Sequence, residues 1–167
     1  LDTLCSGLDH SCIVRAMPNT PAQIGEGISV WTATAEVTAP QKKWAGAILG
    51  SMGAEIYVDD EGYLDMATAV SGSGPAYVFL FMESLVDAAV DIGLPREMAQ
   101  ELVLRTVLGS GYFAQKSSKS LAELRRMVTS PGGTTAEALL QLEKGKFSDL
   151  ILRAVVAAYD KAKKLGK

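Results

Sequence analysis

Two long apolar segments, at residues 75–92 and 95–116, constrain the fold of this chain more than any other feature. Each has the length and composition of a helix, and its apolar side chains cover more than one face, which implies burial on several sides. One helical layer from a single chain would struggle to cover such faces. The sequence therefore predicts a mainly helical domain that packs against a second copy of itself. The apolar residues of the two segments are Tyr77, Val78, Leu80, Phe81, Leu85, Val86, Ala89 and Val90, then Leu102, Val103, Leu104, Val107, Leu108, Tyr112 and Phe113.

The polar break Asp59-Asp60-Glu61-Gly62 is the natural domain boundary, so the predicted domains are residues 1–60 and 61–167. The first domain mixes short strands with one helix, which is predicted to begin after Thr38 and to stop at Gly53. The apolar face of that helix is expected to comprise Trp44, Ala45, Ile48, Leu49 and Met52. The predicted strands cover residues 13–17, 27–31 and 55–58. The predicted helices after the boundary cover residues 64–71, 75–92, 95–116, 120–128, 134–144 and 148–165.

A glycine loop that runs straight into a helix lies at residues 129–143, with the sequence TSPGGTTAEALLQLE. At the start of a helix several backbone N–H groups lack intrahelical partners, and the dipole adds about half a positive charge, so the site suits a small anion. The hydroxyls of Ser130, Thr134 and Thr135 can add directed hydrogen bonds. The alternative is a well-capped helix start that binds nothing.

Two further motifs lie upstream. The sequence SGSGPAY at residues 71–77 should break a helix, and Pro75 suits the first turn of a new one. It lacks the clear strand and third glycine of a dinucleotide loop. The sequence IVRAMPNTP at residues 13–21 ends a short apolar run in a turn, as at the carboxyl end of a strand, where open α/β sheets bind ligands. Asn19 suits recognition of an amide or a ribose, or else simply stabilises the turn.

Several classes of function find no support in the composition. The net charge is −3, and the Lys and Arg residues are scattered rather than gathered into a basic patch that would bind nucleic acid. No uninterrupted apolar run approaches a membrane span, so no membrane partner is expected. Cys5, Cys12 and the single His10 do not form a metal-binding spacing, and free thiols in a reducing compartment are expected. We therefore expect a cytoplasmic protein without a metal.

Together, RAMPNTP, SGSGPAY and TSPGGTTAEALLQLE closely resemble the pyrroline-5-carboxylate reductase family, and the resemblance runs over nearly the whole chain, including the GLP at residues 93–95. It implies the last step of proline biosynthesis, in which 1-pyrroline-5-carboxylate is reduced to L-proline. The implied hydride donor is the reduced form of NADP or NAD, and NADPH is favoured. The implied fold is a helical dimerisation domain of the 6-phosphogluconate-dehydrogenase C-terminal type, preceded by the α/β tail of a Rossmann domain. An intertwined homodimer, open to assembly into larger oligomers, is also implied.

The resemblance also implies an absence, because members of this family begin with a Rossmann domain whose glycine-rich loop holds the pyrophosphate. No such loop occurs in this sequence. The chain is therefore expected to be a fragment that has no activity on its own.

The resemblance assigns roles to the three motifs. Backbone N–H groups and a serine of the glycine loop would hold the substrate carboxylate, and the Thr135 hydroxyl would act catalytically at the ring nitrogen. In the interlocked dimer, this loop can serve the cofactor of the partner chain. The substrate-binding residues are then Ser130, Gly132, Gly133, Thr134 and Thr135. The cofactor-binding residues are Met17, Asn19, Thr20, Ser71, Gly72, Gly74 and Pro75.

Two alternatives stay open at this point. The chain alone can be an oligomerisation module, or it can belong to a related enzyme that reduces another imine or a β-hydroxyacid. The β-hydroxyacid enzymes use a catalytic lysine, for which no helix position here is persuasive. Tyr77 is expected to be a packed aromatic residue with a satisfied hydroxyl rather than a proton donor.

Overall fold

The computed structural model describes residues 1–165, which divide into two units. Among the described residues, the first unit comprises residues 1–77 together with residues 153–165, and the second comprises residues 78–152. The elements of the first unit are α1 (Asp2–Leu8), β1 (Val14–Met17), the 3₁₀ helix η1 (Thr20–Ile24), β2 (Gly27–Ala33), α2 (Ala39–Gly50), β3 (Gly53–Tyr57), α3 (Gly62–Ala67) and the π helix η2 (Thr68–Gly72). The remaining helices are α4 (Gly74–Asp91), α5 (Arg96–Lys116), α6 (Leu121–Met127), α7 (Thr134–Lys144) and α8 (Phe147–Leu165).

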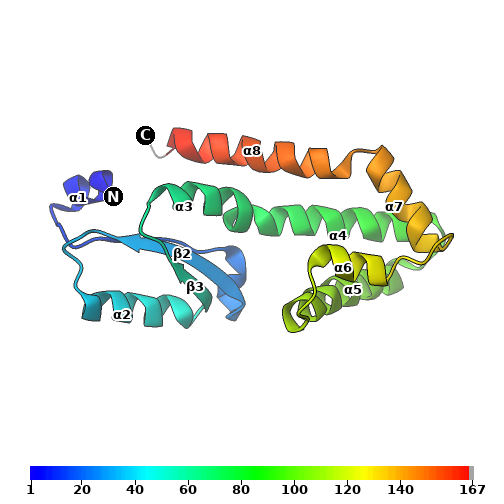
Figure 1. Ribbon diagram of the computed structural model, residues 1–167, viewed down its shortest axis with the longest axis horizontal. Helices are drawn as coiled ribbons and strands as arrows, with labels where there is room; N and C mark the ends of the chain where they lie inside the picture. Colours follow the sequence, from blue (N-terminus) through cyan, green and yellow to red (C-terminus); the bar gives the residue numbers. More distant parts are fainter. Residues whose placement is uncertain (166–167) are drawn as a thin grey trace. The chain divides into compact units, whose positions relative to one another are not determined.

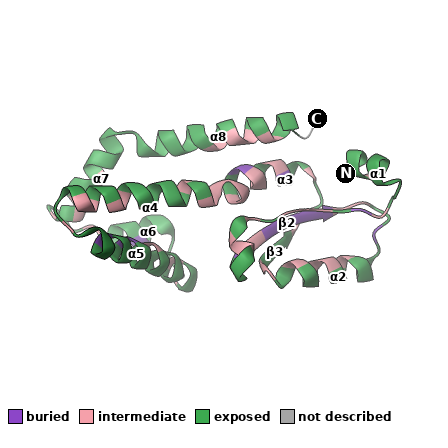
Figure 2. Cartoon of the chain, turned by 180° about the vertical axis from the view of Figure 1, so that it is seen from behind, coloured by how far each residue is buried: buried purple, intermediate pink, exposed green. Residues whose placement is uncertain are grey.

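A three-stranded sheet with the order β1-β2-β3 forms the centre of the first unit. Strand β1 runs antiparallel to β2, so that Met17 lies opposite Val30, and β3 runs parallel to β2. The core of the unit lies on β2, where Val30, Trp31 and Thr32 are buried. Figure 2 shows β2 as the most continuous buried segment of the chain. The sheet pairs each predicted strand with a neighbour, so the three strands and the mainly helical fold class are confirmed.

Helices α2 and α3 cover opposite faces of this sheet (Figure 1). Thr38 and Gln41 form a capping box that begins α2, as a Thr before the first turn predicts. The expected apolar face of this helix was partly wrong, because the side chains of Trp44 and Ile48 are 65% and 66% exposed. The helix instead turns Gly46 toward the sheet, where a Cβ on that residue would lie 3.5 Å from the Trp31 ring. The Trp31 ring fills this space in place of side chains from the helix.

The break predicted between the helices at residues 64–71 and 75–92 is a π turn, and the helix continues through it. The backbone N–H of Ser73 donates to the carbonyl of Thr68 at 2.8 Å, five residues back, so Gly62–Asp91 is one continuous 30-residue helix. The expectation that no apolar run approaches a membrane span was therefore wrong. Within residues 1–165, this one helix is long and apolar enough, with a mean hydropathy of 1.2 over an 18-residue window. One such helix is weak evidence, because a core helix of a soluble protein passes the same test.

The second unit buries few apolar side chains within the chain. Ala99 and Val103 of α5 and Leu124 of α6 are buried. In contrast, α4 and α8 are mostly exposed (Figure 2), and Phe79 and Leu80 are each 63% exposed. Segments that were expected to be buried on several sides are thus left uncovered by their own chain. The predicted domain boundary at residue 60 stays a prediction.

Candidate functional site

The glycine loop before α7 has a tightly constrained backbone. Gly132 has a φ of +67°, in the left-handed region that favours glycine, and the backbone N–H of Gly133 donates to the Ser130 carbonyl at 3.1 Å. The Ser130 Oγ occupies the space that a Cβ on Gly133 would need. The two glycines therefore allow the loop to fold back on Ser130 at the start of the helix.

The N-terminus of α7 is left open for a ligand. Gly133 is the N-cap and has no side chain to accept a hydrogen bond. Over residues 129–137, which the structure describes in full, the backbone N–H groups of Thr134, Thr135 and Ala136 have no hydrogen-bond acceptor. Thr134 is exposed and Thr135 half-buried, so a small anion has access to both. The unpaired donors and the helix dipole make this an anion-binding geometry.

The turn after β1 is built around Asn19. The Asn19 side-chain oxygen accepts a hydrogen bond from the backbone N–H of Ile28 at 2.9 Å, and Asn19 also caps η1, which begins at Thr20. This bond ties the turn to the start of β2. Of the Asn19 side chain, the NH₂ group is then left to donate to a ligand.

The structure brings Met17 and Gly72 together, although 54 residues of chain separate them in sequence. A Cβ on Gly72 would lie 2.6 Å from the Met17 Cε, so only glycine leaves room for this methyl group. Ser71, Gly74 and Pro75 are half-buried in the same stretch. Two of the three predicted motifs therefore meet on one face of the sheet.

Side-chain hydroxyls stabilise the π turn. The Ser71 hydroxyl donates to the Ala67 carbonyl at 3.0 Å, and the Thr68 hydroxyl donates to the Leu64 carbonyl at 2.7 Å. The Tyr77 hydroxyl donates to the carbonyl of the buried Ala69 at 3.2 Å. The expectation that the Tyr77 hydroxyl is satisfied is thus confirmed. Single-turn π insertions are frequent at functional sites, and this one ends within the SGSG sequence of residues 71–74.

An ion cluster that sequence reasoning missed lies at the start of α3. Arg15 Nη1 is 2.6 Å from a carboxylate oxygen of Glu61, and Arg15 Nη2 is 3.5 Å from Asp65. Partial burial acts to raise the pKa of Glu61, but hydrogen bonding, including the bond from Arg15, outweighs it, so this pKa lies below its ordinary value. The acidic residues of the polar break at residues 59–62 were visible in the sequence, but no local signal paired Glu61 with Arg15, which lies 46 residues earlier.

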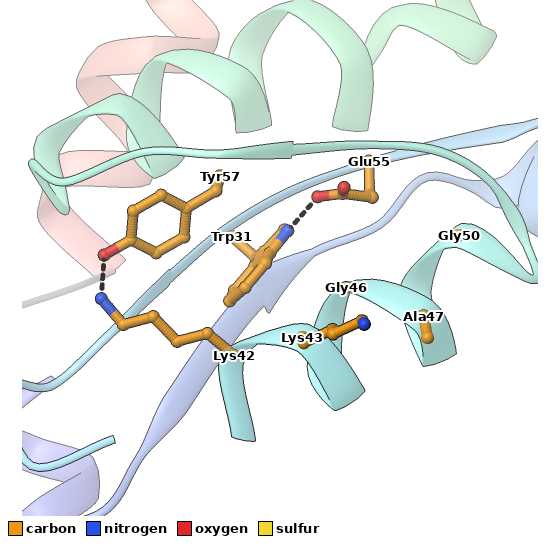
Figure 3. Close-up of a pocket in the computed structure, with 8 residues that line it drawn as sticks. All are labelled: Trp31, Lys42, Lys43, Gly46, Ala47, Gly50, Glu55 and Tyr57. Carbon is orange, nitrogen blue, oxygen red and sulfur yellow. Dashed lines mark hydrogen bonds between the residues drawn. The ribbon is translucent and has the colours of Figure 1, made fainter. Parts of the chain in front are cut away.

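A pocket between α2 and the sheet, shown in Figure 3, was also not predicted. Its polar groups satisfy one another: Trp31 Nε1 donates to Glu55, and Lys42 Nζ donates to the Tyr57 hydroxyl at 2.7 Å. Trp31 and Met17 face opposite sides of the sheet, since Met17 pairs with Val30, the neighbour of Trp31. The pocket therefore lies apart from the Met17 and Gly72 contact and leaves few free polar groups for a ligand.

The predicted site residues fall into two groups. The cofactor group lies in the first unit and the glycine loop in the second. The donor set of the first group, an amide NH₂ and small residues beside a methionine, fits the nicotinamide end of a dinucleotide. Neither connection from a strand into a helix, at residues 34–38 and 58–61, carries the glycines that a pyrophosphate requires. Within residues 1–165, no cluster of three or more His, Cys, Asp or Glu side chains could hold a metal ion.

Comparison with known proteins gives a consistent result. The family model for pyrroline-5-carboxylate reductase dimerisation matches residues 61–165. A pyrroline-5-carboxylate reductase of Pseudomonas aeruginosa is 44% identical over 155 residues, which are 93% of this chain and 57% of that protein. One from Arabidopsis thaliana is 42% identical, with 97% of this chain and 58% of that protein covered. The chain thus spans less than two thirds of the length of these relatives.

Solved structures match equally well. A pyrroline-5-carboxylate reductase from Streptococcus pyogenes superimposes with a TM-score of 0.93 at 34% identity, covering 98% of this chain and 63% of that one. A Plasmodium falciparum pyrroline carboxylate reductase with NADP bound superimposes with a TM-score of 0.89 at 43% identity, covering 93% and 62%.

Proposed function

We propose a function from the finding that this chain belongs to the pyrroline-5-carboxylate reductase family. In this proposal, the chain supplies the substrate loop and the nicotinamide-side residues of an enzyme that reduces 1-pyrroline-5-carboxylate to L-proline. The family match over residues 61–165 carries this proposal, and a relative that is 44% identical bears the same name. The open helix N-terminus at Gly133 adds a physical reason, because the proposed substrate is a small anion.

In this proposal the glycine loop binds the substrate. The free N–H groups of Thr134 and Thr135 hold the carboxylate, and Ser130 assists. Gly132 supplies the left-handed turn, and Gly133 leaves the N-cap open while its own N–H donates to the Ser130 carbonyl. These groups orient the ring without needing a nucleophile or a metal, so the contribution of the protein is positioning and electrostatics. The Thr135 hydroxyl would then donate a hydrogen bond at the ring nitrogen, where a proton is needed in the product.

When bound, the reduced cofactor supplies the hydride. The residues of this chain that would hold its nicotinamide end are Met17, Asn19 and Thr20 after β1, and Ser71, Gly72, Gly74 and Pro75 at the π turn. The Asn19 NH₂ is a free directional donor among them, and the Met17 and Gly72 contact supplies an apolar surface. NADPH is the favoured cofactor in this proposal, supported by the relative solved with NADP bound.

Self-association completes the proposed enzyme. The exposed apolar side chains of α4 and α8 need a partner, and the matched family model is that of a dimerisation domain. We propose an intertwined homodimer in which the glycine loop of one chain serves the cofactor of its partner. Assembly into larger oligomers and a cytoplasmic location belong to the same proposal.

Substrate comparison tests this function against its alternatives. The protein to use is this chain preceded by the N-terminal region of the Pseudomonas aeruginosa relative, called the extended protein below. We expect NADPH-dependent reduction of 1-pyrroline-5-carboxylate and at least tenfold lower kcat/KM for 1-pyrroline, which lacks the carboxylate. NADP-dependent oxidation of a β-hydroxyacid in place of imine reduction would favour the related enzyme class. A folded dimer without either reaction would favour a purely structural module.

A further inference from the structure

Helix α3 is held on strand β1 at two points, one of which the proposed chemistry does not use. Arg15 and Met17 are alternate residues of β1, so their side chains leave the same face of the sheet. Arg15 pairs with Glu61 and Asp65 at the start of α3, and Met17 contacts Gly72 at the end of the π turn. The same strand thus holds both ends of the α3–η2 segment.

Two attachment points fix a helix more completely than one. From Asp65 to Gly72 the helix makes about two turns, roughly 10 Å. Contact at both ends therefore fixes the position of the helix along the strand and its rotation about its own axis. The planar guanidinium of Arg15 is suited to this role, because its donors have a fixed geometry and can reach two carboxylates at once.

Without Arg15, the start of α3 would carry an unbalanced charge pair. Glu61 and Asp65 are four residues apart, which places them on the same face, one turn from each other. Their carboxylates would repel once the guanidinium between them is removed. The helix would then shift from its present register, and the Met17 and Gly72 contact at its other end would shift with it.

We propose that Arg15 is a positioning residue for the reductase: by holding Glu61 and Asp65, it sets the place of the SGSG turn against Met17. This inference rests on the proposed function, in which Met17 and Gly72 bind the nicotinamide end of the cofactor. The Arg15, Glu61 and Asp65 side chains are 32%, 33% and 24% exposed, and ion pairs of such exposure contribute little to stability. The cluster therefore acts mainly by setting geometry, and its contribution to the free energy of unfolding is modest.

The experiment compares Arg15→Gln and Arg15→Lys with the parent extended protein. The matched control is Arg96→Gln, which removes an ion pair of 3.0 Å to Asp87 between side chains that are more than half exposed. The measurements are the NADPH Kd from nicotinamide fluorescence, the KM values, kcat and Tm. We expect Arg15→Gln to raise the Kd and KM for NADPH about tenfold, with the KM for pyrroline-5-carboxylate changed less than twofold. Arg15→Lys should recover part of the loss, and Arg96→Gln should match the parent.

A variant Arg15→Gln with the NADPH Kd and KM of the parent would overturn the inference, even if its Tm fell. If Arg15→Gln does not fold, Glu61→Gln, which removes the shorter of the two ion pairs of Arg15, is judged by the same criterion. A parent that binds NADPH but does not reduce pyrroline-5-carboxylate would refute the proposed function. The fluorescence Kd would still decide whether Arg15 positions the cofactor-binding turn.

Discussion

Ser130 and Gly133 are fitted to each other: the serine Oγ fills the space beside the glycine Cα that any larger residue would need for its Cβ. This relationship links the sequence of the loop to its open helix N-terminus. A side chain at residue 133 would push Ser130 away and change the direction of the N–H groups that follow.

Gly133→Val in the extended protein should therefore weaken binding of L-proline at least about tenfold, or about 1.4 kcal/mol. Isothermal titration calorimetry measures this directly. Proline binding by Gly133→Val equal to that of the parent would show that the loop does not form an anion site.

Thr135→Ala should lower kcat/KM for pyrroline-5-carboxylate. Loss of one transition-state hydrogen bond costs roughly 1–3 kcal/mol, which corresponds to about 5- to 150-fold in rate. Thr135→Ser keeps the hydroxyl and is the control, expected to retain most of the rate. Steady-state kinetics that do not distinguish Thr135→Ala from Thr135→Ser would remove Thr135 from the mechanism.

Gly72→Ala should displace the Met17 methyl group, because a Cβ at residue 72 would lie 2.6 Å from it. Overpacking of this kind costs about 1–3 kcal/mol, and the flexible Met17 side chain places the effect at the lower end. We expect a lower Tm and a higher KM for NADPH. Gly7→Ala, in α1 with no atom within 4 Å of the new Cβ, is the control and should not lower the Tm. Restoration of the Tm in Gly72→Ala by Met17→Ala would confirm the contact, and an unchanged Tm in Gly72→Ala would contradict it.

The ion cluster at Glu61 should make stability depend on pH. The pKa of Glu61 is lowered in the folded chain from 4.5, its ordinary value. Its contribution to the free energy of unfolding is therefore complete above about pH 4.5 and is lost as the pH falls through the lower, folded value. Asp2 and Lys163 line the same pocket, so the comparison must isolate Glu61. Urea unfolding of the chain and of Glu61→Gln at several pH values does so: their stability difference should shrink on acidification, and a constant difference would contradict the assignment.

The exposed apolar face of α4 should lie at a subunit interface. Phe79→Glu places a charge on a side chain that is 63% exposed in the single chain. Burial of that charge in a dimer would cost far more than its exposure on a monomer. Sedimentation of Phe79→Glu should give a smaller species than the parent, whereas Glu83→Gln on the same helix should not. A dimeric Phe79→Glu would place the interface elsewhere.

Local signals predicted the secondary structure closely. Thr38 and Ser120 each form a capping box with the residue three positions on, and Gly93 has a φ of +104° where α4 ends. These features depend on residues near each other in the chain, which is why the helix boundaries were predicted to within a few residues. The same holds for the open cap at Gly133.

Long-range relationships could not be predicted in this way. Neither the pairing of β1 with β2 nor the contact between Met17 and Gly72 leaves a local pattern. The π turn was interpreted as a break because SGSGP contains strong helix breakers, although the hydroxyls of Ser71 and Tyr77 stabilise it in place. The exposure of Trp44 was missed because a period of 3.6 residues identifies an apolar face without saying what covers it.

Steady-state oxidation of NADPH with 1-pyrroline-5-carboxylate, followed with the extended protein and with this chain alone, tests the central claim most directly. We expect turnover to L-proline by the extended protein and none by the chain alone, since the described residues lack a pyrophosphate loop. Absence of turnover by a folded, dimeric extended protein that binds NADPH would contradict the assignment of this chain to proline synthesis.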